Sequence, residues 1–302
     1  MADALLQTFP LGTQWPTIDP FLFCAHHNDA YPAANDRFGP AATLAGRQIG
    51  SDFGGVEGWN MYHGQVVPGF PQHPHRGFET VTYMLAGRMR HRDHLGNVGL
   101  LEPGSVQWMT AGSGVVHSEL PTEDMMRLGG KMHGFQLWVN LPAEKKMVDP
   151  RYQGYDADEI AQVQLANGGL LKVVAGEVHG VRGPVETTSP MTYAHAVMEA
   201  SDVVEWHPQE GHTALVHVFD GEVKVNGSTT SSGEMVVMQR TAGIVRIEST
   251  KAQAQVLLLG GQPLGEPVVR YGPFVMNTKQ EIVDAVQEYN DGTLVKVGKK
   301  TL

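Results

Sequence analysis

An internal repeat of strand-like segments around glycines restricts the fold of this chain more than any other feature. Gly87 and Gly221 each end an apolar run, in LAGRM and FDGEV, and a His-Pro pair precedes each glycine at the same distance. Downstream, EPGSVQWM and SSGEMVVM bring Gly104 and Gly233 into correspondence. Because such self-similarity indicates that one structural unit occurs more than once, we expect two versions of a single β-barrel.

Short apolar runs bounded by Gly and Pro make up much of the remaining sequence, as in GFETVTYMLAG, ALVHVFDGEVKV and AQVLLLGG. Such runs are typical of the strands of an all-β sandwich or barrel. The clearest helical pattern is NTKQEIVDAVQEYNDG, where Thr278 and Glu281 form a capping box and Ile282, Val283 and Val286 form an apolar stripe. The predicted fold class is therefore all-β, with one short C-terminal helix.

The repeat also predicts where the domains begin and end. We expect a first barrel within residues 1–145, a polar linker containing Pro and Gly over 146–164, and a second barrel within 165–302. The last range includes the helix and a tail after residue 262, which can fold back across either barrel. A chain of 302 residues has room for two domains of this size.

Composition excludes several classes of protein. The formal net charge of −10 argues against binding to a nucleic-acid backbone. Cys24 is the single cysteine, which excludes an intrachain disulfide and any metal cluster held by several thiolates. The first residues lack the basic start and apolar core of a secretory signal, and no stretch approaches the roughly 20 apolar residues of a membrane span. We expect a cytoplasmic protein that binds neither nucleic acid nor membrane.

Two histidines separated by one residue, His73 and His75, stand just before the strand-like run FETVTYMLA. Since alternate residues of a strand share a face, both imidazoles can bind one ion. His117 and Glu119 have the same spacing within VVHSE. Together the two pairs predict a metal site of three imidazoles and one carboxylate. This ligand set suits Fe(II), Mn, Ni, Cu or Zn, and a five- or six-coordinate ion keeps an open position.

The second copy carries a different set of side chains. His207 and Glu248 persist at the corresponding positions, but Gln209 and Arg246 stand where the first copy has imidazoles. A guanidinium stays protonated and has no lone pair for a metal. We therefore expect no ion in the second barrel, and we expect Arg246 to pair with Glu248.

The segments FPQHPHRGFETVTYMLAG, LEPGSVQWMTAGSGVVHSELP and GFQLWVNLP closely resemble the pirin family of the cupin superfamily, and YGPFVMNTKQEIVDAVQEYNDG resembles its C-terminal signature. The resemblance covers most of the chain. It implies two cupin (jelly-roll) barrels packed face to face, with one iron-type ion in the N-terminal barrel. The ligands that it implies are His73, His75, His117 and Glu119.

The resemblance implies two alternative functions. Several bacterial pirins resemble quercetin 2,3-dioxygenases, which open a flavonol ring with O₂, whereas animal members resemble redox-sensitive cofactors of transcription regulators. We expect the dioxygenase, with a flavonol such as quercetin and O₂ as its small-molecule partners. The expected cofactor is Fe(II), with Mn, Ni, Cu, Co or Zn as alternatives. The alternative function is a non-enzymatic, iron-dependent redox sensor that binds a regulatory protein partner.

Two carboxylates compete for the fourth ligand position. General cupins use a glutamate at the position of Glu79, whereas pirins resemble this chain in supplying Glu119. A dioxygenase also needs a group that removes the hydroxyl proton of the flavonol. Glu119 is the expected catalytic residue for this step, and Glu79 is the second candidate.

For other polar residues near these segments we expect structural roles rather than metal binding. HRDH, His91–His94, is expected to be a polar hairpin tip, and His26 and His27 a surface loop. Arg76 and Asp93 are candidates for contacts that orient the imidazoles. The barrel around the metal is expected to have an apolar lining, formed by Met84, Trp108, Met109, Phe135 and Leu137.

Overall fold

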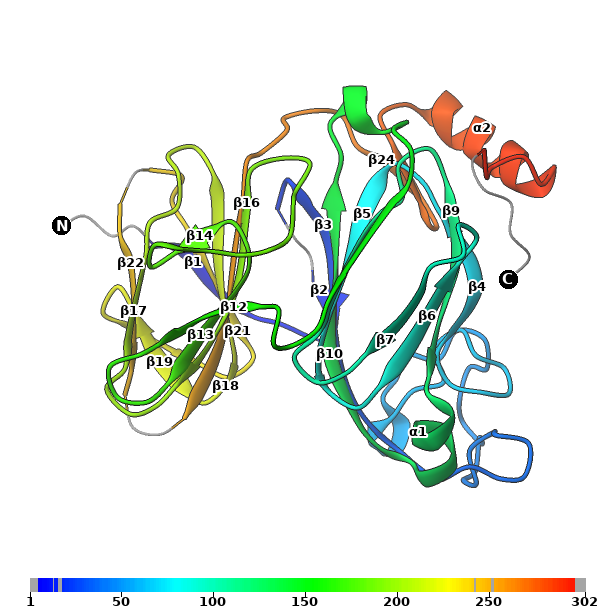
Figure 1. Ribbon diagram of the computed structural model, residues 1–302, viewed down its shortest axis with the longest axis horizontal. Coiled ribbons are helices and arrows are strands. Elements are labelled where there is room, and N and C mark those ends of the chain that lie inside the picture. The colour runs from blue at the N-terminus through cyan, green and yellow to red at the C-terminus, as the bar shows by residue number, and fades with distance from the viewer. Residues whose placement is uncertain (1–4, 13, 16–17, 242, 251–252, 297–302) are drawn as a thin grey trace. The chain divides into compact units, whose positions relative to one another are not determined.

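Two compact units, both built almost entirely of strands, make up the chain (Figure 1). The computed structural model describes residues 5–12, 14–15, 18–241, 243–250 and 253–296. The unit that we call the first barrel contains Cys24–Ala157 and the described part of Glu266–Leu302. The second barrel contains the described part of Met1–Phe23 together with Asp158–Gly265. The predicted all-β class is confirmed.

Two layers of strands form the first barrel. One sheet contains, in spatial order, β11, β8, β5, β10 and β3, and the other contains β4, β9, β6 and β7. The strands of the first sheet are β3 (Phe21–Tyr31), β5 (Phe78–Ala86), β8 (Val106–Thr110), β10 (Gly130–Asn140) and β11 (Arg151–Tyr155). Those of the second sheet are β4 (Phe70–His75), β6 (Met89–Asp93), β7 (Val98–Leu101) and β9 (Val115–Pro121).

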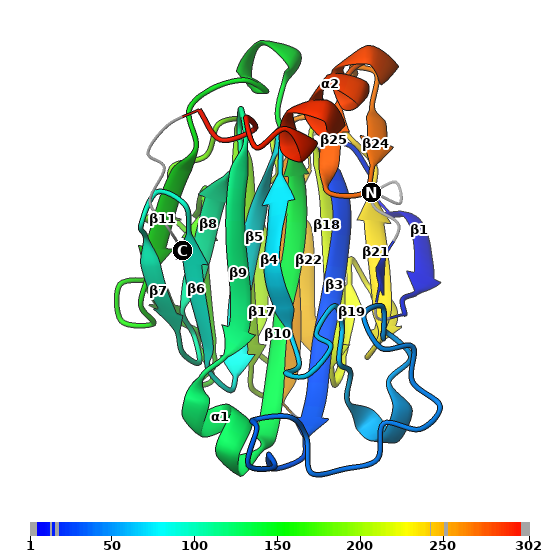
Figure 2. The ribbon, with the colours of Figure 1, turned by 90° about the vertical axis from the view of Figure 1, so that its right-hand side faces the viewer.

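Helices lie at both ends of the first barrel (Figure 2). The six-residue helix α1 (Glu123–Leu128), which the sequence did not predict, lies at one end, and α2 (Lys279–Asn290) at the other. Beside α2 lies the hairpin of β24 (Val269–Tyr271) and β25 (Phe274–Met276). Single 3-10 turns occur at Val56–Gly58 and Ala143–Lys145. Neither α-helix of the described chain has the length and hydropathy of a membrane-spanning segment.

The predicted capping box begins α2. The backbone N–H of Glu281 donates to Thr278 Oγ1 at 3.2 Å, and the backbone N–H of Thr278 donates to Glu281 Oε2 at 2.8 Å. Ile282 and Ala285 are buried on the packed face, but Val283 is 57% exposed. The predicted stripe is therefore wrong at Val283, because the helix turns that position toward solvent.

The second barrel also has two layers. A seven-stranded sheet has the order β1, β21, β18, β23, β16, β13, β12, and a four-stranded sheet has the order β17, β22, β19, β20. The strands of the larger sheet are β1 (Leu5–Pro10), β12 (Ala161–Gln164), β13 (Leu170–Ala175), β16 (Met191–Met198), β18 (Thr213–Asp220), β21 (Glu234–Met238) and β23 (Ala254–Gly261). The strands of the smaller sheet are β17 (Val203–Trp206), β19 (Glu222–Val225), β20 (Ser228–Ser231) and β22 (Val245–Ser249). Strands β14 (Glu177–Val178) and β15 (Val181–Arg182) pair with each other, and β2 (Gln14–Trp15) belongs to neither of these two sheets.

Both ends of the chain depart from the domain boundaries expected at 1–145 and 165–302. Strand β1 pairs antiparallel with β21 and so belongs to the second barrel. The tail returns to the first barrel, where Phe274 forms a bridge with Arg76 and Glu288 Oε2 accepts a hydrogen bond from Arg76 Nη2 at 2.6 Å. The difference has a physical reason, because local periodicity predicts strands but not which distant strand completes a sheet edge.

Candidate metal centre

One face of the neighbouring strands β4, β9 and β6 carries the predicted imidazoles. In the antiparallel register, His73 lies directly opposite His117, and Glu119 lies opposite His91. Directly opposed residues share a face of a sheet, and so do residues two apart on one strand. His75 therefore joins the same face, and segments that are distant in the sequence supply one cluster.

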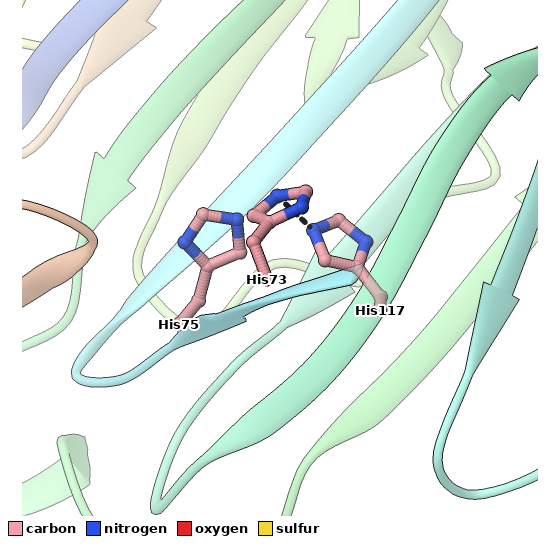
Figure 3. Close-up of side chains that lie close together, drawn as sticks. All are labelled: His73, His75 and His117. Carbon is pink, nitrogen blue, oxygen red and sulfur yellow. Dashed lines mark hydrogen bonds between the residues drawn. The ribbon is translucent and has the colours of Figure 1, made fainter. Parts of the chain in front are cut away.

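The three imidazoles point toward one another (Figure 3). Nε2 of His117 lies 2.9 Å from Nε2 of His73, and the ring centroid of His75 lies 4.7 Å from that of His73 and 4.9 Å from that of His117. One nitrogen of each ring lies within 4.8 Å of one nitrogen of each other ring. Two imidazole nitrogens that each bind one ion at about 2.1 Å, at right angles, are about 3 Å apart. The spacing therefore fits a shared ion.

Burial favours the neutral form of these rings. His75 is 3% exposed and His117 is 0% exposed. Loss of hydration lowers the pKa of both imidazoles well below the usual value, and the charge of His73 adds to the effect. Burial also lowers the pKa of His73, against the opposing influence of Glu119. A neutral imidazole is the form that offers a lone pair to a metal.

His75 shows most directly that the cluster fits a metal. Its Nδ1 and Nε2 are both buried, and the one described polar group that reaches the ring is the backbone of Pro273, at a geometry too poor for a normal hydrogen bond. A buried polar atom without a partner costs roughly 1–3 kcal/mol. A metal ion bound at this ring would satisfy one of the two nitrogens.

His91 is a further donor, in a segment for which the sequence favoured a hairpin tip over an accessory metal site. It is fully buried in β6, and its ligand atom lies within 4.8 Å of those of His117 and Glu119. Nδ1 of His91 lies 3.3 Å from Nδ1 of His117, the nitrogen that does not face His73. Nε2 of His91 lies 3.5 Å from Oδ2 of Asp93. The predicted hairpin tip is wrong here, because strand alternation turns His91 and Asp93 inward; the spacing rule that found the other pairs would have detected them.

Donors from the opposite sheet hold both oxygens of Glu119. Oε1 accepts from Thr82 Oγ1 at 3.1 Å and from Gln107 Nε2 at 3.4 Å, and Oε2 accepts from Gln136 Nε2 at 2.8 Å. Glu119 is 1% exposed. Its carboxylate is therefore fixed between the two sheets by neutral donors.

The competing carboxylate, Glu79, lies in β5 and accepts a hydrogen bond from Thr110 Oγ1 at 2.7 Å. Among the described residues, the groups of ligand atoms within 4.8 Å of one another contain Glu119 but not Glu79. Strands β4 and β5 belong to different sheets, and the chain turns between them at Gly77, where φ is +85°. Glu119 is therefore the carboxylate nearest the cluster, but its ligand atom is grouped with those of His117 and His91 and not with those of His73 and His75. The five side chains expected to form an apolar lining are all buried, and two of them, Met84 and Phe135, line a small cavity beside Thr82.

In the second barrel, apolar side chains occupy the inner positions of the corresponding strands. Trp206 pairs with Val245 and Val204 with Ile247, and all four are buried. Arg246 and Glu248 instead face solvent and pair with each other, with Nε 2.6 Å from Oε1. The expected pairing of Arg246 with Glu248 is confirmed. The alignment of the two copies placed Arg246 at the position of His117 and Glu248 at the position of Glu119. This alignment is wrong by one residue, and a shift of one residue moves a side chain from the inner face of a strand to the outer face.

The buried imidazoles also predict how metal-free protein responds to pH. Unfolded histidines take up protons below about pH 6.5, whereas His75 and His117, with lowered pKa values, stay neutral in the fold. The unfolded state then binds more protons, so stability falls as pH drops below about 6.5. We expect a lower thermal midpoint for metal-free protein at about pH 5.5 than at about pH 7.5. His117→Gln should reduce this difference. A midpoint that does not change with pH would contradict the prediction.

Comparison with known proteins gives independent matches over most of the chain. The family model described as Pirin matches residues 5–139, and the model described as Pirin C-terminal cupin domain matches residues 193–295. A protein of Pseudomonas aeruginosa named a putative quercetin 2,3-dioxygenase is 44% identical over 241 residues, which cover 76% of this chain and 81% of that protein.

Two solved structures extend these matches to the fold. Quercetin 2,3-dioxygenase from Acinetobacter baumannii superposes with a TM-score of 0.79 at 30% identity, over 96% of this chain and 97% of that chain. The bacterial pirin YhhW from Escherichia coli, in complex with nickel(II), superposes with a TM-score of 0.52 at 25% identity, over 65% of this chain and 77% of that chain.

Proposed function

Since this chain belongs to the pirin family and has two cupin-type domains, we propose that it is a metal-dependent dioxygenase that acts on a flavonol such as quercetin with O₂. The observation that carries the proposal is the cluster of His73, His75 and His117 in the first barrel, with the last two buried and the first half-buried. The buried carboxylate of Glu119 lies beside His117. The names of its relatives supply the substrate class. As expected from the sequence, the proposed location is the cytoplasm.

We assign the ligands as His73, His75, His117 and Glu119, and the ion as Fe(II) or another divalent transition metal. When bound, such an ion supplies a Lewis acid and a template that brings a flavonol hydroxyl and O₂ together. His91 orients His117 through the contact between their Nδ1 atoms, which leaves Nε2 of His117, beside Nε2 of His73, as the nitrogen that would bind an ion. The assignment of Glu119 as the proton acceptor, made from the sequence, stays a prediction.

Gln136 tests whether the donors to Glu119 matter for metal binding. We expect Gln136→Leu to weaken metal affinity about 10–100-fold, because it removes the 2.8 Å hydrogen bond that orients Oε2. Gln107→Leu is the matched control, and we expect a smaller effect because its 3.4 Å contact is weak. Competition with a chelating dye measures both affinities. Equal losses in the two variants would contradict this role for Gln136.

Oxygen uptake with quercetin tests the proposed function. Iron-loaded protein should consume O₂ and quercetin in equal amounts, at a turnover of about 1 s⁻¹ or faster. Metal-free protein is the control and should consume neither. If protein with one ion per chain consumes no O₂ with quercetin or other flavonols, the enzyme proposal fails and the redox-sensor alternative takes its place.

A further inference from the structure

A buried chain of hydrogen bonds lies in the first barrel beside the candidate metal centre, and it uses none of the proposed ligands. Tyr62 Oη donates to Asp29 Oδ2 at 2.6 Å and lies 2.6 Å from His27 Nδ1. Asn60 Nδ2 donates to the other oxygen of Asp29 at 2.9 Å, and its own carbonyl accepts from the backbone N–H of Gly55. His27 and Asp29 share one face of β3, so the expected surface loop at His27 is wrong.

The fold holds Tyr62 in place at some cost. Its φ is +54°, in the left-handed region that costs a residue with a side chain about 1–2 kcal/mol. Two backbone hydrogen bonds of 2.9 Å to Asp52 fix this conformation, and Asp52 in turn accepts from Arg47 Nη1 at 2.8 Å. Backbone strain of this kind concentrates at functional sites. The strained backbone therefore holds the Tyr62 hydroxyl between Asp29 and His27.

A small cavity lies between these hydrogen-bonded residues and Thr82, a donor to Glu119. His27, Asp29, Tyr62 and Thr82 all line it, and Thr82 donates to Glu119 Oε1 at 3.1 Å. Its volume is about 20 Å³. A space of about 10–15 Å³ holds one water, so this cavity admits a hydroxyl group or a single water but no aromatic ring. The occupant that fits is the O–H end of a ligand whose body lies elsewhere.

The hydrogen bonds among His27, Tyr62 and Asp29 allow two arrangements of their protons. In the first, Asp29 is ionised, Tyr62 donates to it, and His27 donates through Nδ1, which leaves a lone pair on His27 Nε2. In the second, Asp29 is protonated and donates to Tyr62, Tyr62 donates to His27 Nδ1, and the proton of His27 lies on Nε2. A proton that arrives at Nε2 converts the first arrangement into the second without charging His27. No electrons move, and the arriving proton is in effect stored on Asp29.

We propose that His27, Tyr62 and Asp29 form a proton relay that takes the hydroxyl proton of the substrate. The substrate O–H bond breaks, an N–H bond forms at His27 Nε2, and the shift through Tyr62 leaves the carboxyl proton on Asp29. The assignment of the substrate rests on the proposed function. The relay is the alternative to proton transfer to Glu119, whose oxygens already accept three hydrogen bonds and which then acts only as a ligand.

The surroundings support this direction of transfer. Burial lowers the pKa of His27 to about 4, so a lone imidazolium is disfavoured. Burial also raises the pKa of Asp29, although hydrogen bonds from Tyr62 and Asn60 oppose the shift, so Asp29 is the better final acceptor. The other ionisable groups around the relay are Tyr31 on β3 and Arg47, Asp52 and His63 on the segment before β4; the cavity residues from β5, β6 and β10 are uncharged.

The first arm of the test needs no substrate. In ¹⁵N NMR of histidine-labelled protein, with His27 assigned through His27→Gln, acidification should switch His27 from the Nδ1–H to the Nε2–H tautomer. Tyr62→Phe and Asp29→Asn should abolish the switch. Tyr31→Phe is the matched control and should retain it, because the hydroxyl of this buried tyrosine makes no hydrogen bond to any described residue. A His27 that keeps one tautomer, or that still switches in Tyr62→Phe, overturns the relay.

The second arm uses quercetin with iron-loaded protein. Tyr62→Phe should lower kcat about 100-fold at unchanged metal content, and under anaerobic conditions the bound quercetin should lose the red-shifted absorption of its anion. Unchanged kcat and an unchanged spectrum overturn the assignment of the relay to the substrate. If wild-type protein neither binds nor oxidises quercetin, the proposed function fails, and the tautomer measurement still decides whether the relay exists.

Discussion

His117→Ala should abolish metal binding and, with it, oxygen uptake with quercetin. His117 lies at the middle of the cluster, opposite His73 and beside Glu119, and is the residue shared by both groups of close ligand atoms. Loss of a contact that only orients a ligand costs about 10–100-fold in affinity, so loss of this ligand should cost more than about 100-fold. Metal analysis after dialysis should give about one ion per chain for wild-type protein and almost none for the variant.

His207→Ala is the matched control for this experiment. His207 is the residue that the repeat aligns with a ligand, but it is exposed in the second barrel. We expect its replacement to leave metal content unchanged. Circular dichroism should confirm that His117→Ala remains folded, and His117→Gln provides a second variant that fills more of the space. A full complement of metal in folded His117→Ala would mean that the ion binds elsewhere.

Gly77→Ala should strongly destabilise the first barrel, by at least about 3 kcal/mol. A Cβ atom at Gly77 would lie 2.0 Å from the carbonyl oxygen of Val275, and the glycine has a φ of +85°. The positive φ alone costs about 1–2 kcal/mol, and the overlap adds to it because backbone must move. Lys146 limits that movement, since its buried Nζ donates to the carbonyls of both Gly77 and Val275.

Gly46→Ala separates the cost of the positive φ from the cost of the steric overlap. Gly46 lies in the same unit, has a φ of +80°, and has open space where a Cβ would be placed. We expect it to lose only about 1–2 kcal/mol. Urea unfolding of both variants measures the difference. If the two glycines prove equally tolerant, the tail does not pack against the loop after His75 as described.

The sequence predicted much of the centre because its ligands obey a local rule. His73 with His75, and His117 with Glu119, are spaced for one face of a strand, and burial on that face follows from the alternation. The same rule applied to HRDH would have given His91 and Asp93. The segment is polar throughout, which favours a turn, and its pairing with β9 depends on contacts distant in the sequence.

Other features were not accessible from local patterns. The sequence alignment of the two copies is wrong by only one residue, yet it placed Arg246 at the position of His117. Arg246 faces solvent, whereas His117 faces the interior of its barrel. The relay of His27, Tyr62 and Asp29 joins β3 to a long irregular segment, whose path depends on the pairing of Arg47 with Asp52 and on the ring of Trp59 beneath Arg47. Neither contact has a periodicity that a sequence displays.

The exchange of chain ends between the two barrels sets the order in which a nascent chain can mature. Strand β1 emerges first from the ribosome, but its partner β21 is among the last strands of the second barrel to be synthesised. The loop that follows His75 likewise waits for Val275 and Glu288, which are made later still. Neither barrel can therefore finish folding during translation of its own half, and ion uptake should follow completion of the tail rather than of the first barrel's strands.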